Sequence, residues 1–251
     1  MVKLLTLLLG LVLALPAGVD YDAVNDVLSC GSADDVDNMT PMTLTWRMRL
    51  DGDGESTTLG GIILGKQQST AASFMVLRYR SASGDIQFVI DGATGTISQA
   101  WAISTSTVPK TYVMVWDGGG TSTSMRLWED GVQKSQGAYE SSAVSGYDDS
   151  DGNLNVGNRD TDTARTFNGV LSCFAIWEAV APANDIAILG AGGGCRQAVR
   201  QTSMGTPLRF WPMDDGVHGV AVTTSVMDES GNAGHCTPSN NPAFEAIQVG
   251  Y

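Results

Sequence analysis

The chain has 251 residues, of which 43% are hydrophobic, so it can bury a sizeable core in one large domain or two small ones. Its formal net charge is -13, and the 14 basic residues are scattered among 27 acidic ones without forming a basic stripe. Because nucleic-acid binders neutralise phosphates with Lys and Arg, this balance excludes DNA and RNA as partners.

Residues 1–17 form an apolar N-terminal segment in which an uncharged run from Leu4 to Leu15 precedes Pro16 and Ala17. The pattern is typical of a signal peptide cleaved near Ala17 or Gly18, and it predicts a secreted, extracellular protein. The run is too short to span a bilayer comfortably, so an integral membrane protein is not expected. The alternative is a retained apolar arm, buried against the domain or in a neighbouring subunit of an assembly or homo-oligomer.

The first strong strand signal runs from Met42 to Leu50 (MTLTWRMRL), where apolar and polar residues alternate without a fault. Alternation with a period of two predicts a half-buried strand. Further short strands are expected at regular intervals along the chain, separated by turn residues. They are 61–66, 74–80, 85–91, 97–103, 112–116, 124–129, 153–156 and 167–177. Such a series is typical of an all-β sandwich or barrel.

One helix is expected, starting at Pro182 and ending at Gly190. The three glycines from Gly192 to Gly194 indicate a flexible joint after it. Residues 191–251 are rich in turns and too few to hold a large core alone, so we expect this C-terminal segment to pack on the main domain, residues 18–190, or on a partner.

Five stretches follow one another in a characteristic order: Tyr21–Val27, Met42–Arg49, Tyr112–Gly118 (YVMVWDG), Met125–Gly131 (MRLWEDG) and Phe167–Trp177 with its helix. In this order and spacing they resemble the concanavalin A-like, laminin-G-like (LamG) jelly-roll family. The resemblance covers about two-thirds of the chain. It implies a jelly-roll β-sandwich of two antiparallel sheets.

The resemblance also implies a tendency to bind glycans or proteins, although a fold alone does not specify a ligand. We therefore expect a non-enzymatic, lectin-like adhesion or surface protein that recognises a glycan or a surface protein. The alternative is a phage virion structural protein, such as a capsid decoration or tail adhesion subunit, which would keep its N-terminal arm and lie on the virion surface. A glycoside hydrolase is a weaker alternative.

Catalytic residues are not predicted. Glycoside hydrolysis needs two carboxylates that face the sugar, and the nearest candidates, Asp51, Asp53 and Glu55, are separated by glycines in a turn. A Ser-His-Asp triad needs a positioned histidine, and the two histidines, His218 and His235, both lie in the turn-rich C-terminal segment.

Calcium is the one cofactor that the sequence suggests, because it binds hard oxygen ligands on loops. In laminin-G-like folds, a calcium ion at the rim often helps to bind glycans or receptors. Acidic loops without a metal are the competing interpretation. The candidate ligands fall in two clusters, which are Asp148, Asp149, Asp151 and Asn153, and Asp51 and Asp53 with Glu55.

Two tryptophans are candidates for stacking on a sugar. Trp101 is one, and Trp128 is the other, because it is out of phase with Met125 and Leu127 and is expected to point outward. The competing interpretation is that Trp128 is covered by a second layer of the protein.

The chain has four cysteines without a CxxC pair and only two histidines, and this pattern argues against a zinc site. Either the cysteines form two disulfides, or they are buried as small apolar side chains. Because the resemblance places the first and closing strands side by side, it implies the pairs Cys30–Cys173 and Cys195–Cys236.

Overall fold

The structure is a computed structural model. The residues that it describes are 17–22, 24–54, 60–67, 74–141, 148–150, 152–158, 165–214, 221–223, 225–240 and 242–246. Residues 1–16, Glu55, Asp151 and His218 lie outside these ranges.

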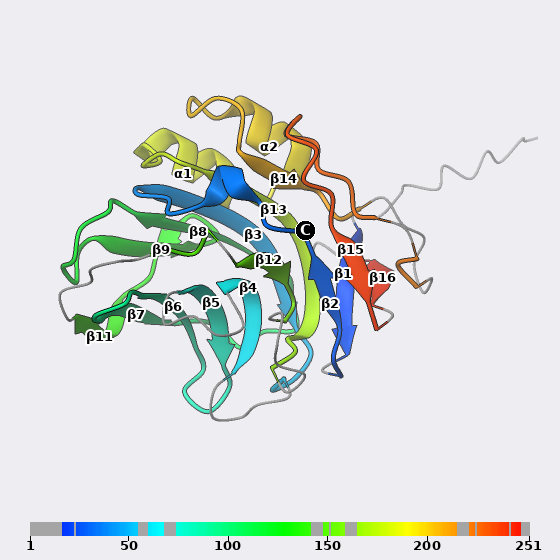
Figure 1. The fold of residues 1–251 in the computed structure, drawn as a ribbon, viewed down its shortest axis with the longest axis horizontal. Coiled ribbons are helices and arrows are strands. Elements are labelled where there is room, and N and C mark those ends of the chain that lie inside the picture. The colour runs from blue at the N-terminus through cyan, green and yellow to red at the C-terminus, as the bar shows by residue number, and fades with distance from the viewer. Residues whose placement is uncertain are drawn as a thin grey trace, which may run out of the picture.

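The described part of the chain is a sandwich of two antiparallel sheets of eight strands each, which face one another in Figure 1. This confirms the predicted fold class. The first sheet consists of β1 (Ala17–Asp22), β3 (Met42–Leu50), β8 (Lys110–Trp116), β9 (Met125–Glu129), β10 (Val132–Gln133), β13 (Asn168–Trp177), β14 (Arg209–Trp211) and β16 (Ala243–Ala246). Their order is β10-β9-β8-β3-β13-β1-β16, and β14 pairs with the second half of β13.

The second sheet has the order β11-β7-β6-β5-β4-β12-β2-β15. Its strands are β2 (Val27–Ser29), β4 (Gly61–Gln67), β5 (Phe74–Arg80), β6 (Asp85–Asp91), β7 (Thr96–Ala102), β11 (Gln136–Ser141), β12 (Asn153–Val156) and β15 (Thr237–Ser239). A short 3-10 helix, η1 (Asp34–Val36), lies between β2 and β3.

The core lies between the sheets, where side chains alternate inward from each strand. Trp46 of β3 is fully buried there and stacks on Tyr112 and on Phe174. The bounds of β3 are those predicted, but its outward residues are not solvated. Thr43, Thr45 and Arg47 are all buried, so the expected half-buried strand is buried on both faces.

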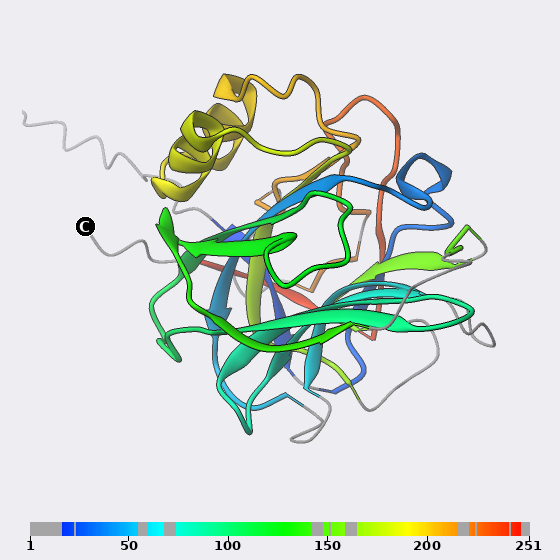
Figure 2. The same cartoon turned by 90° about the vertical axis from the view of Figure 1, so that its left-hand side faces the viewer.

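Two helices cover the outer face of the first sheet, as Figure 2 shows. The helix α1 (Ala183–Gly190) confirms the expected one, whereas α2 (Cys195–Gln201) was not predicted. The glycine loop between them is held in place by β3. The Arg47 guanidinium donates hydrogen bonds to the carbonyls of Gly192 (3.1 Å) and Gly193 (2.9 Å), so this loop is anchored rather than a free joint.

The C-terminal segment extends both sheets of the sandwich. From it, β14 and β16 join the first sheet beside β13 and β1, and β15 joins the second sheet beside β2. The C-terminal segment therefore packs on the main domain of its own chain and adds strands to both sheets (Figure 1).

Candidate functional site

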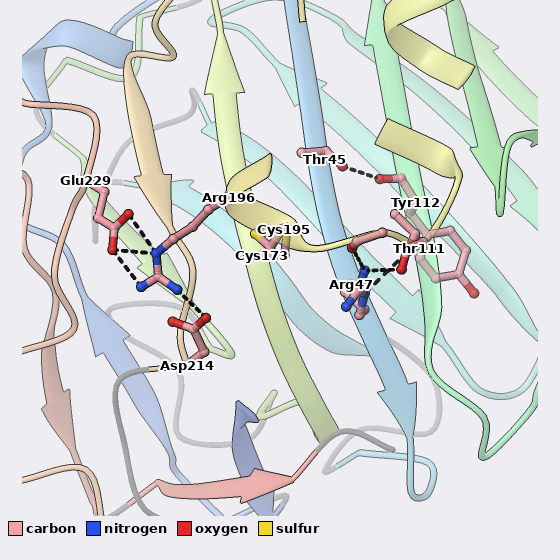
Figure 3. The surroundings of a disulfide bond; sticks show 11 residues. Thr45, Arg47, Thr111, Tyr112, Cys173, Cys195, Arg196, Asp214 and Glu229 are labelled. Carbon is pink, nitrogen blue, oxygen red and sulfur yellow. Dashed lines mark hydrogen bonds and ion pairs between the residues drawn. A yellow bond between two sulfur atoms is a disulfide. The ribbon is translucent and has the colours of Figure 1, made fainter. Parts of the chain in front are cut away.

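Both disulfides differ from the predicted pairs. The structure joins Cys30 to Cys236 and Cys173 to Cys195. The prediction was wrong because Cys30 follows β2, which belongs to the second sheet and pairs with β15, whereas Cys173 lies in the first sheet. Cys173 sits in a bulge of β13 with a positive φ of 57°, and its disulfide ties β13 to the start of α2 (Figure 3).

Neither candidate tryptophan is an open stacking platform. Trp101 faces the core between the sheets and is fully buried, so its assignment as a ligand-binding residue was wrong. Trp128 does point away from that core, as expected, but it packs in the apolar layer under the helices and is 9% exposed. This agrees with the competing interpretation, in which a second layer of the protein covers Trp128. The guanidinium of Arg126 lies 5.8 Å from the centre of its ring.

In the loop that carries Asp148 and Asp149, both residues form hydrogen bonds with other residues of the same chain. Asp149 accepts a hydrogen bond from the backbone N–H of Asn38 (2.9 Å), and its own N–H donates to Asn38 Oδ1 (3.0 Å). Asp148 accepts hydrogen bonds from the side chain and backbone of Ser150, which lower the pKa of Asp148. The partly exposed Asn153 follows at the start of β12, and Asp151 lies outside the described residues.

A buried ammonium supplies the positive charge at this rim. Lys66 of β4 is fully buried, and its Nζ pairs with the carboxylate of Asp37 and donates to the carbonyl of Asp149 (3.0 Å). A metal ion would have to displace this lysine or share its ligands. Among the described rim residues, Asp37 and the carbonyl of Asp149 already have the ammonium of Lys66 as their cation, so they do not fit the predicted calcium ion.

The second acidic cluster is a surface turn. Asp51 accepts two hydrogen bonds from Arg49 (2.8 and 2.6 Å) and forms an ion pair with it. Asp53 is exposed, and Glu55 lies outside the described residues. Within the described ranges, no group of three or more acidic, histidine or cysteine side chains is arranged to hold a metal ion.

A hollow beside α2 combines polar and apolar side chains and has a volume of ≈ 400 Å³. This volume falls within the range of about 300–1,000 Å³ that small-ligand sites occupy. Its lining residues are Val199, Arg200, Thr202, Gly205, Thr206, Pro207, Phe210 and Glu229. Val199, Pro207 and Phe210 give it an apolar wall, and Arg200 makes no hydrogen bond or ion pair with any described residue.

The walls of this hollow are held by contacts that sequence reasoning did not find. Arg196 of α2 pairs with Glu229 and with Asp214, which joins the helix to the C-terminal segment (Figure 3). The hydrogen bonds that Arg196 donates to the carboxylate of Glu229 are the main reason that the pKa of Arg196 is raised. The carboxylate of Asp185 accepts hydrogen bonds from the backbone N–H groups of Ser203 (2.8 Å) and Met204 (3.2 Å) and so fixes the loop after α2.

Two other hollows have a more uniform lining. One, of ≈ 370 Å³, lies along β9–β11 and is lined only by polar residues, which are Thr123, Arg126, Gln133, Lys134, Ser135 and Gln136. The other, of ≈ 440 Å³, lies between α1 and α2 against alanines, glycines, glutamines and Ile188. Sugars present both hydroxyl groups and apolar C–H faces, so the mixed hollow beside α2 suits them better.

These features define a β-sandwich of the lectin-like type, with a helical layer on one face and a candidate ligand hollow beside that layer. The chain belongs to the concanavalin A-like lectin/glucanases superfamily, because residues 22–187 match the family profile for its laminin G-like domain. This confirms the family resemblance. A comparison with curated protein sequences gives no match.

Several solved structures are similar to this one in fold. A Bacteroides ovatus protein, named as a candidate carbohydrate-binding protein, has a TM-score of 0.57 at 13% identity, over 95% of this chain and 63% of its own. A SAP-like pentraxin from Limulus polyphemus has a TM-score of 0.48 at 12% identity, over 72% and 84% of the two chains. The CBM40 of a Ruminococcus gnavus sialidase, bound to sialyllactose, has a TM-score of 0.45 at 10% identity, over 68% and 96%. At these identities the likeness concerns the fold alone.

Two observations bear on the cellular location. The two disulfides are typical of proteins that fold in an oxidising compartment outside the cytoplasm. Of the helices in the described ranges, neither is long and apolar enough to cross a membrane.

Proposed function

We propose that this protein is a non-enzymatic glycan-binding protein and that the hollow beside α2 receives the sugar. The observation that carries the proposal is the composition of that hollow, in which Arg200, a side chain without a partner among the described residues, lies beside an apolar wall. The hydroxyl of Thr206 adds a further polar group at the same place. The superfamily and the name of the Bacteroides ovatus protein support a carbohydrate as the ligand.

A glycan array probed with the labelled full chain tests this proposal. We expect selective binding to a group of related glycans. Arg200→Ala should weaken that binding by about 10- to 100-fold, since a hydrogen bond from a charged group contributes roughly 1.5–3 kcal/mol.

The matched control is Arg126→Ala, because Arg126 lines the separate polar hollow along β9–β11. This variant should bind as the unaltered protein does. The proposal fails if no glycan binds, or if both variants bind normally.

The absence of catalysis is part of the proposal and has its own measurement. Each bound oligosaccharide, incubated with the protein and then separated by chromatography, should be recovered intact. Hydrolysis that disappears in Asp51→Asn or Asp53→Asn would instead identify a glycoside hydrolase.

We also propose that the protein is secreted after cleavage near Ala17 or Gly18. The pattern of residues 1–17 supports this, as do the two disulfides, which are typical of proteins that fold outside the cytoplasm. N-terminal sequencing of the natural protein should find a start close to Gly18. A start at Met1 would favour the retained-arm alternative.

A further inference from the structure

The two disulfides differ in how far solvent can reach them. Cys30 and Cys236 are 5% and 0% exposed, and both lie among the residues of the main core. Cys173 is also buried, but its partner Cys195 is only partly buried and lies at the start of α2, on the outer face of the first sheet. Because thiol–disulfide exchange requires access to a sulfur atom, a reductant can approach this second bond from the side of Cys195.

The backbone conformation of Cys173 is unfavourable in itself. Its φ of 57° lies in the left-handed region, which a residue with a Cβ atom adopts at a cost in energy. Two contacts of Cys173 restrain this conformation: the bond to Cys195, and the hydrogen bond that its backbone N–H donates to the carbonyl of Pro212 (3.1 Å). Such conformations persist only where neighbouring contacts hold them. Loss of the disulfide therefore removes one of the two restraints on this bulge of β13.

One wall of the hollow beside α2 depends on the same bond. The helix supplies Val199 and Arg200 to this wall, and Thr202 follows directly after the helix. The disulfide fixes the first residue of a helix that is too short to be stable alone. Opening the bond therefore acts on the wall that carries the unpaired guanidinium.

The contacts that remain after reduction are weaker than the covalent bond. Arg196 pairs with Glu229 and Asp214 (Figure 3), but all three side chains are partly exposed. Ion pairs of this kind contribute little, because water solvates the separated charges. Of the residues of α2, Ala198 and Val199 are buried. Together these contacts position α2 while the disulfide is closed, but they cover only a small part of the helix.

We propose that the Cys173–Cys195 disulfide is a redox switch that controls the ligand hollow beside α2. The reductant is a dithiol, either a protein of the thioredoxin type or a small molecule. Its thiolate attacks Sγ of Cys195, and Cys173 leaves as a thiolate and takes up a proton. The second thiol of the reductant then releases Cys195 as a thiol. Two electrons pass to the protein, and the dithiol becomes a disulfide.

Reduction frees the start of α2, so the helix leaves the first sheet and the hollow loses the wall that carries Arg200. The bond between Cys30 and Cys236 stays closed in the core and keeps the sandwich folded. The inference rests on the proposed glycan-binding function of this hollow and adds a way to control it.

Selective alkylation tests the chemistry. The full, oxidised chain is incubated with dithiothreitol at neutral pH without denaturant, quenched with iodoacetamide and analysed by peptide mass spectrometry. Alkylation of Cys173 and Cys195 should be at least about 10-fold faster than that of Cys30 and Cys236, because the buried pair reacts only when the sandwich opens. Equal rates at all four cysteines would overturn the proposal, since reduction would then require unfolding of the whole chain.

Glycan binding by the selectively reduced protein tests the switch. The protein alkylated at Cys173 and Cys195 should bind at least about 10-fold more weakly than the oxidised protein, and reoxidation of an unalkylated sample should restore binding. The control is the double variant Cys173→Ser with Cys195→Ser, which should bind weakly with or without the dithiol.

Hydrogen exchange separates failure of the switch from failure of the proposed function, because it reports on α2 without any ligand. Reduction should increase exchange in α2 while β3 and β8 stay protected, which shows that weaker binding does not come from unfolding. If the oxidised chain binds no glycan but α2 opens on reduction, the proposed function fails and the redox control of α2 stands. If the oxidised chain binds glycan and reduction changes neither binding nor exchange in α2, the function stands and the switch is wrong.

Discussion

Lys66 has a buried ammonium group, although such a group strongly prefers water. The burial is tolerated because Asp37 and the carbonyl of Asp149 replace the lost hydration. The sequence places Lys66 at the end of an apolar strand, where a lysine normally reaches solvent. Only the approach of two loops from other parts of the chain makes it an internal cation.

We expect Lys66→Met to destabilise the protein by about 2–4 kcal/mol, because it leaves Asp37 without its partner beside a buried site. The measurement is urea unfolding at neutral pH. Lys110→Met is the control, since the ion pair of Lys110 with Asp130 is partly exposed to solvent and pairs at the surface contribute about 0–1 kcal/mol. Equal losses in the two variants would contradict this role of Lys66.

Asp26 should make stability depend on pH. Burial raises the pKa of Asp26 to about 7, the backbone N–H of Asp22 opposes this shift, and the charges of Asp22 and Asp20 add to it. A carboxyl group whose pKa is higher in the folded state loses stability as the pH rises from about 4 to about 7. In EDTA, Asp26→Asn should remove this loss and melt a few degrees above the unaltered protein at pH 8, but not at pH 4. An equal difference at both pH values would argue against a titrating Asp26.

At the scale of elements, the stability of α2 depends on its disulfide bond more than on the helix propensity of its own sequence. It has seven residues, which is too short for a helix to be stable alone. The disulfide to Cys173 holds its first residue, and Arg196 holds the next through Glu229 and Asp214. The hollow beside α2 exists only while these contacts do.

Replacing Cys173 and Cys195 together by serine should cost about 3 kcal/mol, the estimate for a loop closed over a separation of 22 residues. The melting temperature should fall by roughly 6–12 °C at 2–4 °C per kcal/mol. Hydrogen exchange should show α2 exposed while β3 and β8 stay protected. Uniform loss of protection would mean that α2 and the sandwich unfold as one unit.

At the scale of the whole molecule, the C-terminal segment supplies the outermost strand at one edge of each sheet. The disulfide between Cys30 and Cys236 links parts of the chain separated by 206 residues, and Trp211 of β14 is fully buried in the main core. The segment is part of the sandwich rather than an appendage to it.

We therefore expect a chain that ends at Gly190 not to fold stably, because it would expose the edges of β13, β1 and β2. In the complete chain, Cys30→Ser with Cys236→Ser should cost more than loss of the other disulfide, about 5 kcal/mol by the same loop estimate. Circular dichroism and thermal unfolding measure both changes. A truncated chain that melts cooperatively at the temperature of the full chain would refute this account.

Patterns that act within one element predicted the bounds of β3 and α1. The alternation from Met42 to Leu50 predicted β3 to the residue, and the stretch from Pro182 to Gly190 predicted α1. The disulfide pairs, the burial of Trp101 and the role of Lys66 could not be predicted, since each depends on which distant strand lies alongside. Nothing in the sequence indicated that Arg200 and Glu229 line one hollow, because the sequence does not show that α2 and the C-terminal segment are in contact.

The amino-acid sequence by itself determined the fold class and the family, because side-chain periodicity and turn residues are local properties. The tertiary structure alone decided where charges are compensated. The acidic rim holds the internal ammonium of Lys66, and Asp26 is buried with one carboxylate oxygen unpaired. Electrostatic and hydrogen-bond energies depend on distance and burial, and these are set only when the two sheets pack.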